Sequence, residues 1–131
     1  RHDHIGFNYR MPNINAALGC AQLENLDKYI ASKRAVAAEY IEHFKNVDGI
    51  DFFVEPENTF SNYWLSAVVL KDKDAQLDFL QQTNDNGVMT RPIWELMNRL
   101  PMFENCENDG LKNTIWFADR VVNIPSSVRI N

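Results

Sequence analysis

The sequence predicts an α/β fold of the α+β-like kind, in which helices cover one face of a small, mainly antiparallel sheet. The strongest indication is the order of the patterned segments, which is helix, strand, strand, helix, strand, helix, strand. Glycine, proline and asparagine stand between these segments and mark the turns. The chain has 131 residues, which is the length of one domain with a core of its own. We therefore treat residues 1–131 as a single domain.

The first segment after an irregular start is a long predicted helix. Residues 1–11 have no regular period, and Pro12 suits a first helical turn because its missing N–H is not needed there. Apolar residues then recur at helical spacing as far as Phe44, and Gly49 follows the end of the stripe. A helix of about 30 residues would be about 45 Å long. We expect such a helix to leave an apolar face for a contact outside this chain, and we expect Cys20 to be buried within it.

The later elements follow from short runs of aromatic and β-branched residues and from one further amphipathic stretch. Proline ends two of the strands, and an Asn-Gly pair closes the middle helix. The predicted elements are strands at 50–54 and 63–70, a helix at 72–86, a strand at 88–91, irregular chain at 92–110, a helix at 111–120 and a strand at 121–124.

Composition excludes several classes of protein. The net charge of −5 argues against a general nucleic-acid binder, which would show a basic surface. No apolar run approaches the length of a membrane span. Two cysteines are too few and too scattered for a disulfide framework, and a cytoplasmic location fits best. His2 and His4 do not make a closed metal site by themselves, so we expect no metal.

The most specific segment is the glycine-led loop before the first helix. Asn8, Tyr9 and Arg10 place an amide, a phenol and a guanidinium beside a helix N-terminus, where anions are favoured. Residues 6–23 read Gly-Phe-Asn-Tyr-Arg-Met-Pro-Asn-Ile-Asn-Ala-Ala-Leu-Gly-Cys-Ala-Gln-Leu. This run resembles the signature that opens the C-terminal part of the pyridoxal-phosphate-dependent nucleotide-sugar aminotransferases, the DegT/DnrJ/EryC1/StrS family.

Three later segments resemble the same family and occur in the same order. They are Gly-Val-Met-Thr-Arg-Pro-Ile-Trp at 87–94, Leu-Pro-Met-Phe at 100–103 and Asn-Ile-Pro-Ser-Ser at 123–127. The resemblance implies the small C-terminal domain of a fold-type I aminotransferase that works as a homodimer. It also implies that the large cofactor domain, with the lysine that forms a Schiff base and the acidic residue at the pyridine nitrogen, lies upstream of this chain. We therefore expect no catalytic residue in this chain, which alone should be inactive and should not bind the cofactor.

The resemblance also assigns roles to individual residues. Asn8 would bind the phosphate of pyridoxal phosphate in the neighbouring subunit, and Arg10, with Tyr9, would meet the anionic nucleotide-sugar. Arg91 and Trp94 leave a strand end and are expected to line the substrate pocket. Asn98 stands near the position where the family often has histidine, so an imidazole contact is not carried over, although its amide remains able to donate a hydrogen bond.

The activity that the resemblance implies is transfer of an amino group from an amino acid, with glutamate expected, to a nucleotide-linked keto-sugar. Two alternatives remain open: a sugar dehydratase of the same fold, and a non-catalytic module that binds nucleotide-sugars. The residues exclude a Ser-His-Asp hydrolase, because no Gly-x-Ser-x-Gly segment accompanies the serines at 126–127. The remaining aromatic residues are expected in the core or at interfaces. These are Tyr63, Trp64, Phe103, Trp116 and Phe117.

Overall fold

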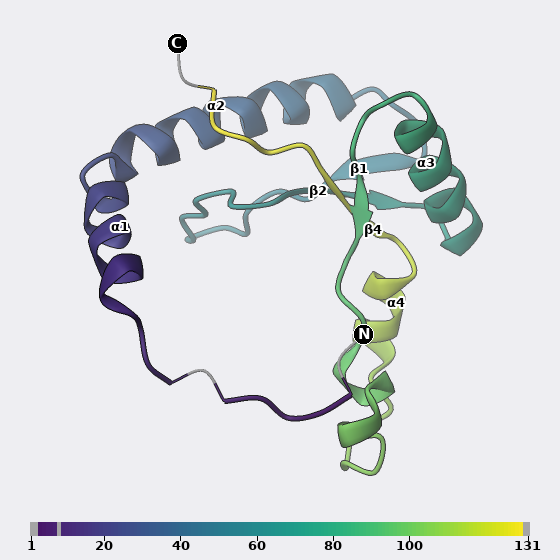
Figure 1. The fold of residues 1–131 in the computed structure, drawn as a ribbon. Helices are drawn as coiled ribbons and strands as arrows, with labels where there is room; N and C mark the ends of the chain where they lie inside the picture. Colours follow the sequence, from purple (N-terminus) through teal and green to yellow (C-terminus); the bar gives the residue numbers. More distant parts are fainter. Residues whose placement is uncertain (1–2, 8, 130–131) are drawn as a thin grey trace.

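The structure is a computed structural model that describes residues 3–7 and 9–129. A four-stranded sheet lies at its centre, with the strand order β1-β2-β4-β3 (Figure 1). The strands are β1 (Ile50–Phe52), β2 (Ser66–Leu70), β3 (Arg91–Pro92) and β4 (Val121–Ile124). All three neighbouring pairs are antiparallel. The predicted fold class is therefore confirmed.

Four α-helices and two short 3₁₀ turns connect these strands. The helices are α1 (Asn13–Leu23), α2 (Leu26–Phe44), α3 (Lys73–Asp85) and α4 (Lys112–Ala118), and the turns are η1 (Met97–Arg99) and η2 (Pro101–Phe103). Helix α3 begins at Asp72, whose carboxylate accepts a hydrogen bond from the backbone N–H of Ala75 at 2.9 Å. This N-cap satisfies one of the donors that a helix start leaves free.

One face of the sheet carries the core. Ser66, Val68 and Leu70 alternate along β2 and are buried, and the register places Ile124 opposite Ser66 and Val122 opposite Val68 on that same face. Side chains from two helices pack against this face: Ala37, Tyr40 and Phe44 from α2, and Ala75, Phe79 and Leu80 from α3. Both helices therefore cover one side of the sheet, as the sequence predicts.

The predicted single long helix is wrong, because the chain bends between α1 and α2. Asn25 leaves the helical conformation, with φ −110° and ψ 3°. Its backbone N–H donates to Gln22 at 3.1 Å, and its side-chain amide donates to the carbonyl of Ala21 at 3.3 Å. These bonds satisfy carbonyls at the end of α1 and so end that helix.

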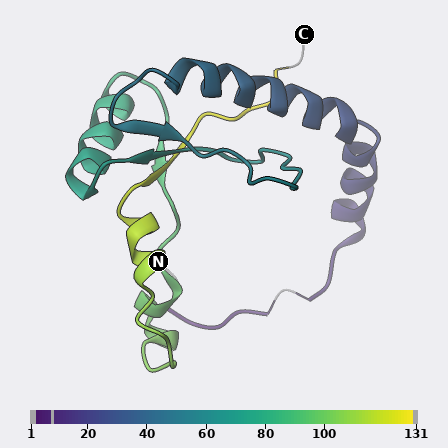
Figure 2. The ribbon, with the colours of Figure 1, turned by 180° about the vertical axis from the view of Figure 1, so that it is seen from behind.

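Helix α1 consequently leaves the domain, and it has no buried residue. With the segment before it, α1 forms an arc that stands apart from the sheet and curves back toward the side of α4 (Figure 2). The expected buried position of Cys20 is wrong, because nothing in the described part of the chain covers α1 and the thiol is exposed. Ile14, Leu18 and Leu23 are exposed as well, so an apolar helix surface is left free as expected.

Three predicted strands are shorter than expected. The run at 63–70 begins its ladder only at Ser66, because Tyr63 has a left-handed backbone with φ 46°. The strand predicted at 88–91 is wrong in its position: β3 shares only Arg91 with it and includes Pro92, which was expected to end the strand but is tolerated because β3 lies at the sheet edge. The strand predicted at 50–54 ends at Phe52. No helix in the described residues is long and apolar enough to span a bilayer.

Candidate functional site

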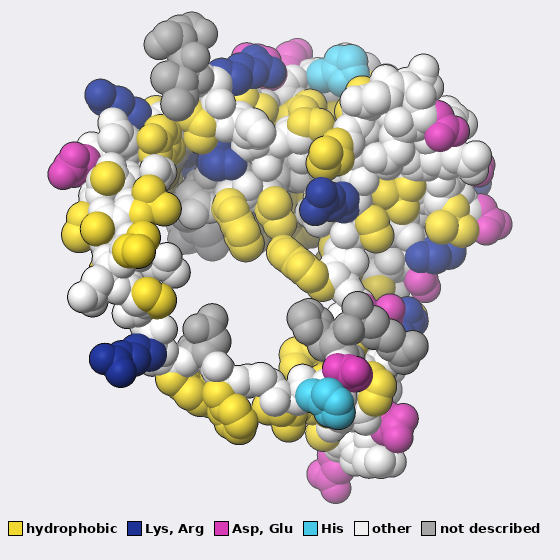
Figure 3. All heavy atoms as spheres, in the orientation of Figure 1, with side chains coloured by type: hydrophobic (Ala, Val, Ile, Leu, Met, Phe, Trp, Pro, Cys, Tyr) yellow, Lys and Arg dark blue, Asp and Glu magenta, His cyan; other side chains and the backbone are white. Residues whose placement is uncertain are grey.

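The N-terminal arm, which we define as residues 3–7 and 9–12, is exposed throughout. Ile5, Phe7, Tyr9 and Met11 place apolar side chains at every second position, and the rings of Phe7 and Tyr9 lie 6.1 Å apart. Hydrophobic side chains gather along the arm and over α1 (Figure 3). Asn8 lies outside the described residues, so its predicted contact with a cofactor phosphate stays a prediction.

Tyr9 and Arg10 lie together where the arm meets α1. With Met11, Pro12 and Asn15 they line a hollow of about 380 Å³. Pro12 precedes the helix and provides no side-chain cap. Among the described residues the first N–H groups of α1 therefore have no side-chain acceptor, and their position near Arg10 favours an anion.

A second hollow lies beside β3 and contains two further predicted residues, Arg91 and Trp94. Its volume is about 560 Å³. It is lined by Leu65, Met89, Arg91, Pro92, Ile93, Trp94, Asn123, Ile124 and Pro125, and we call it the β3 pocket. Arg91 faces Asn123 across the β3–β4 pair. The sequence therefore identified two residues that the fold brings to one pocket.

The guanidinium of Arg91 is available to a ligand. Its Nη2 contacts the sulfur of Met89 at 3.4 Å, and no carboxylate in the described chain forms an ion pair with it. Trp94 is also largely accessible, with 70 % of the residue's surface exposed. A guanidinium and an aromatic face at one apolar pocket match a ligand with both anionic and planar groups.

Asn98 does not line the β3 pocket, so the structure does not bring it together with Arg91 and Trp94. It lies in η1, and its side-chain oxygen is buried with no hydrogen-bond donor among the described residues. The predicted substrate contact of Asn98 therefore has no support from its position, although its buried oxygen leaves one acceptor free.

The sequence analysis expected Trp64 in the core or at an interface, whereas the structure places it against Trp94 of the β3 pocket. Its indole stacks on that of Trp94, with ring centroids 6.3 Å apart and an interplanar angle of 28°. Strand alternation places Trp64 on the core side with Ser66 and Val68, yet Tyr63 is buried in its place. The left-handed backbone of Tyr63 reverses the alternation, and no feature of the sequence signals that change.

The loop that leads to Trp64 is fastened to α2 by an ion pair. The guanidinium of Arg34 binds both oxygens of Glu55, at 2.9 and 2.7 Å, and donates to the carbonyl of Ser61 at 2.6 Å. Glu55 also accepts from the N–H of Ser61 at 2.6 Å. The Arg34 hydrogen bond, followed by that of Ser61, lowers the pKa of Glu55 to about 2. The loop therefore has a defined position against the helix.

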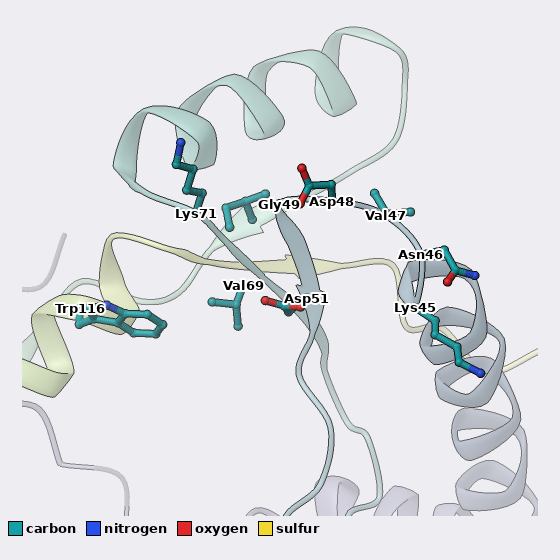
Figure 4. A pocket seen from close by; sticks show the side chains of 10 residues that line it. Lys45, Asn46, Val47, Asp48, Gly49, Asp51, Val69, Lys71 and Trp116 are labelled. Atoms are coloured by element: carbon teal, nitrogen blue, oxygen red, sulfur yellow. The ribbon is translucent and has the colours of Figure 1, made fainter.

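A third hollow, of about 590 Å³, lies where α2 ends and β1 begins (Figure 4). Lys45, Lys71, Asp48 and Asp51 line it together with Trp116. The two ammonium groups point in different directions in Figure 4 and do not converge on the cavity. Opposite charges without a common focus do not define a ligand, so this hollow is not a candidate site. Among the described residues no three metal-binding side chains gather.

The family model described as the DegT/DnrJ/EryC1/StrS aminotransferase family matches residues 1–131. The chain belongs to this family. It is 33% identical over 131 residues to GDP-perosamine synthase of Vibrio cholerae, covering 95% of this chain and 35% of that protein. It is 26% identical over 137 residues to dTDP-4-amino-4,6-dideoxy-D-glucose transaminase of Escherichia coli, covering 96% of this chain and 36% of that protein.

A solved structure shares the architecture. Helicobacter pylori PseC, an aminotransferase involved in the biosynthesis of pseudoaminic acid, superposes with a TM-score of 0.81 at 17% identity, over 100% of this chain and 36% of that one. The antiparallel four-stranded sheet with its helices is thus a partial domain of the kind found in the sugar aminotransferases. The chain spans about a third of the length of the relatives it matches.

Proposed function

We propose that this chain forms the small C-terminal domain of a pyridoxal-phosphate-dependent nucleotide-sugar aminotransferase. The full-length protein would move an amino group from an amino acid, with glutamate as the expected donor, to a keto-sugar linked to a nucleoside diphosphate. The observation that carries the proposal is the β3 pocket, where the unpaired guanidinium of Arg91 meets the exposed indole of Trp94. Membership of the family and the relatives' activities support it.

Each pocket residue has a chemical role in this proposal. Arg91 binds the negatively charged oxygens of the substrate through a fork of N–H donors. Trp94 packs against a flat or apolar face of the substrate. Asn123 lies beside Arg91 on β4 and offers an amide to sugar hydroxyls.

This chain would contact the cofactor only at its phosphate. Tyr9 and Arg10 provide polar groups beside the start of α1, but the described residues do not enclose a phosphate. We propose that Asn8 binds the cofactor phosphate of the neighbouring subunit in a homodimer. The remaining cofactor contacts would come from the rest of the full-length protein. Pyridoxal phosphate, when bound, supplies the carbonyl carbon that receives and returns the amino group. This chain's own residues would bind the substrate and orient it.

The test uses the full-length protein supplied with pyridoxal phosphate, an amino acid and a keto-sugar linked to GDP or dTDP. Formation of an amino-sugar with equal consumption of amino acid is the expected result. Asn8→Ala should weaken retention of the cofactor on dialysis, and Arg91→Met should raise KM for the nucleotide-sugar while leaving cofactor retention unchanged. Equal effects of the two variants on both properties would contradict the separate roles.

The same assay separates the alternatives. A sugar dehydratase would release water from the nucleotide-sugar and give no amino-sugar, and a non-catalytic module would bind the nucleotide-sugar without turnover. Isolated residues 1–131 should show no transamination with added pyridoxal phosphate. A cytoplasmic location stays part of the proposal.

A further inference from the structure

Trp64 stands at the rim of the β3 pocket although it belongs to a different segment from Trp94. It precedes Leu65, which lines the pocket, and its indole stacks on that of Trp94. Most of the ring is nevertheless accessible, since 64 % of the residue's surface is exposed. Two stacked and largely exposed indoles therefore stand at the mouth of a pocket whose Arg91 guanidinium has no carboxylate partner among the described residues.

The backbone of Trp64 is held by three side-chain hydrogen bonds, two of them from distant parts of the chain. Its carbonyl accepts from the ammonium of Lys33 and from the hydroxyl of Ser126, both at 3.1 Å, and its N–H donates to the side chain of Asn62 at 2.9 Å. Lys33 also donates to the carbonyl of Ser126 at 2.5 Å. Helix α2, the loop before β2 and the segment after β4 thus converge on this one residue.

The residue before it carries a strained backbone. Tyr63 has φ 46°, a region that bulky side chains rarely occupy, and its ring is buried in the core against Phe52. Strain of this kind persists only where the surroundings enforce it, and it is common at functional sites. Its effect here is to turn Trp64 out of the core. The indole of Trp64 therefore stays in solvent, and the regular strand begins only at Ser66.

We propose that Trp64 and Trp94 form a stacking platform for the base of a nucleoside diphosphate, with Arg91 binding its phosphates. This inference rests on the proposed function and names the part of the substrate that this face recognises. Aromatic stacking accepts any base, because every base has a π-face, whereas the guanidinium requires an anion. The two indoles and the guanidinium together match a planar ring linked to a diphosphate, a combination that an amino acid or a free sugar lacks.

Binding of GDP, dTDP and inorganic pyrophosphate to the full-length protein, measured by titration calorimetry, tests the platform. Trp64→Leu should raise Kd for the nucleoside diphosphate by about 5- to 150-fold, the usual loss for one aromatic–base stack. Kd for pyrophosphate, which has no base, should stay within about twofold, and Trp64→Phe should recover most of the affinity for the nucleotide. Trp116→Leu is the matched control, since Trp116 is also exposed but lies on α4 at the third hollow.

Three results would overturn the platform. One is unchanged nucleotide affinity in Trp64→Leu, and another is an equal loss of pyrophosphate affinity, which would mean that Trp64 supports the fold only. The third is a loss of nucleotide affinity in Trp116→Leu as large as that in Trp64→Leu. A protein that transaminates while Trp64→Leu binds nucleotide normally refutes the platform and leaves the proposed function standing. A protein that binds nucleotide through Trp64 without transamination refutes the proposed function alone.

Discussion

Replacement of Gln76 by methionine should destabilise the domain more than any other single change of similar side-chain size on α3. Gln76 is 0 % exposed. Its side-chain amide donates to the carbonyls of Ala118 at 3.0 Å and Val121 at 2.8 Å, and its oxygen accepts from Lys73 at 2.7 Å. It therefore joins α3 to the turn between α4 and β4. That turn places β4 beside β3 and so positions the β3 pocket.

The size of the effect follows from the two carbonyls that would lose their donor. The carbonyl of Val121 is bonded in a buried setting, so leaving it unsatisfied costs about 1 to 3 kcal/mol. Ala118 is half-buried, where water can replace the donor, and the net loss there is about 0.5 to 1.5 kcal/mol. Methionine has nearly the volume of glutamine and leaves no cavity. The free energy of unfolding should therefore fall by about 1.5 to 4.5 kcal/mol.

Urea denaturation of the full-length protein measures the total change, and hydrogen exchange of peptides covering residues 112–124 assigns it to this domain. Gln81→Met provides the control, because Gln81 lies exposed on the same helix. The control should change stability by less than about 0.5 kcal/mol. If Gln76→Met were as stable as the control, or if exchange at 112–124 were unaffected, the assigned role of Gln76 would be wrong.

Three further changes test other parts of the fold. Glu55→Gln should lower stability at neutral pH, because it removes the ion pair with Arg34. Since the pKa of Glu55 is lowered to about 2, the wild type gains stability from this pair above a pH of about 4.5 and loses it as the pH falls towards 2. The acid-unfolding curves of variant and wild type should therefore converge near pH 2. Gly87→Ala should lower stability by about 1 to 2 kcal/mol in urea denaturation, since Gly87 has φ 77° and no atom within 4 Å would contact the new methyl group, so that only backbone strain contributes. Asp72→Ala should cost about 1 kcal/mol by removing the α3 N-cap, whereas Asp74→Ala in the first turn should cost less; equal thermal unfolding of the two variants would contradict the cap.

Much of the fold was predictable because the core follows regular periods. The β-branched run that contains β2 and the helical periods of α2 and α3 are visible in the sequence and predict a sheet with one covered face. The division of the first helix was not predictable from the apolar stripe, because it depends on bonds that Asn25 makes to the end of α1. An exposed apolar face on this helix was expected from its predicted length, whereas the exposure of Cys20 was not, because Cys20 stands in an apolar stretch that reads as buried helix.

The site shows the same division between local and tertiary information. Arg91 and Trp94 stand close together at a strand end, so position along the chain was enough to pair them. Trp64 came from a distant segment, and its outward direction depends on the left-handed backbone of Tyr63 and on anchoring by Lys33. Asn98 is near Trp94 in sequence, yet it lies in η1 and does not line the β3 pocket. Tertiary contacts, which the sequence does not show, therefore decide which distant residues come together at the β3 pocket.

The most direct test of the account is a two-step reaction of the full-length protein. The protein loaded with pyridoxal phosphate is first mixed with glutamate alone, and the cofactor's absorbance is followed; a GDP- or dTDP-linked keto-sugar is then added. The account predicts that glutamate converts the cofactor to its amino form and that the keto-sugar restores the original spectrum as an amino-sugar appears. A cofactor that does not accept the amino group from any amino acid, or an amino form that no nucleotide-linked keto-sugar discharges, would contradict it.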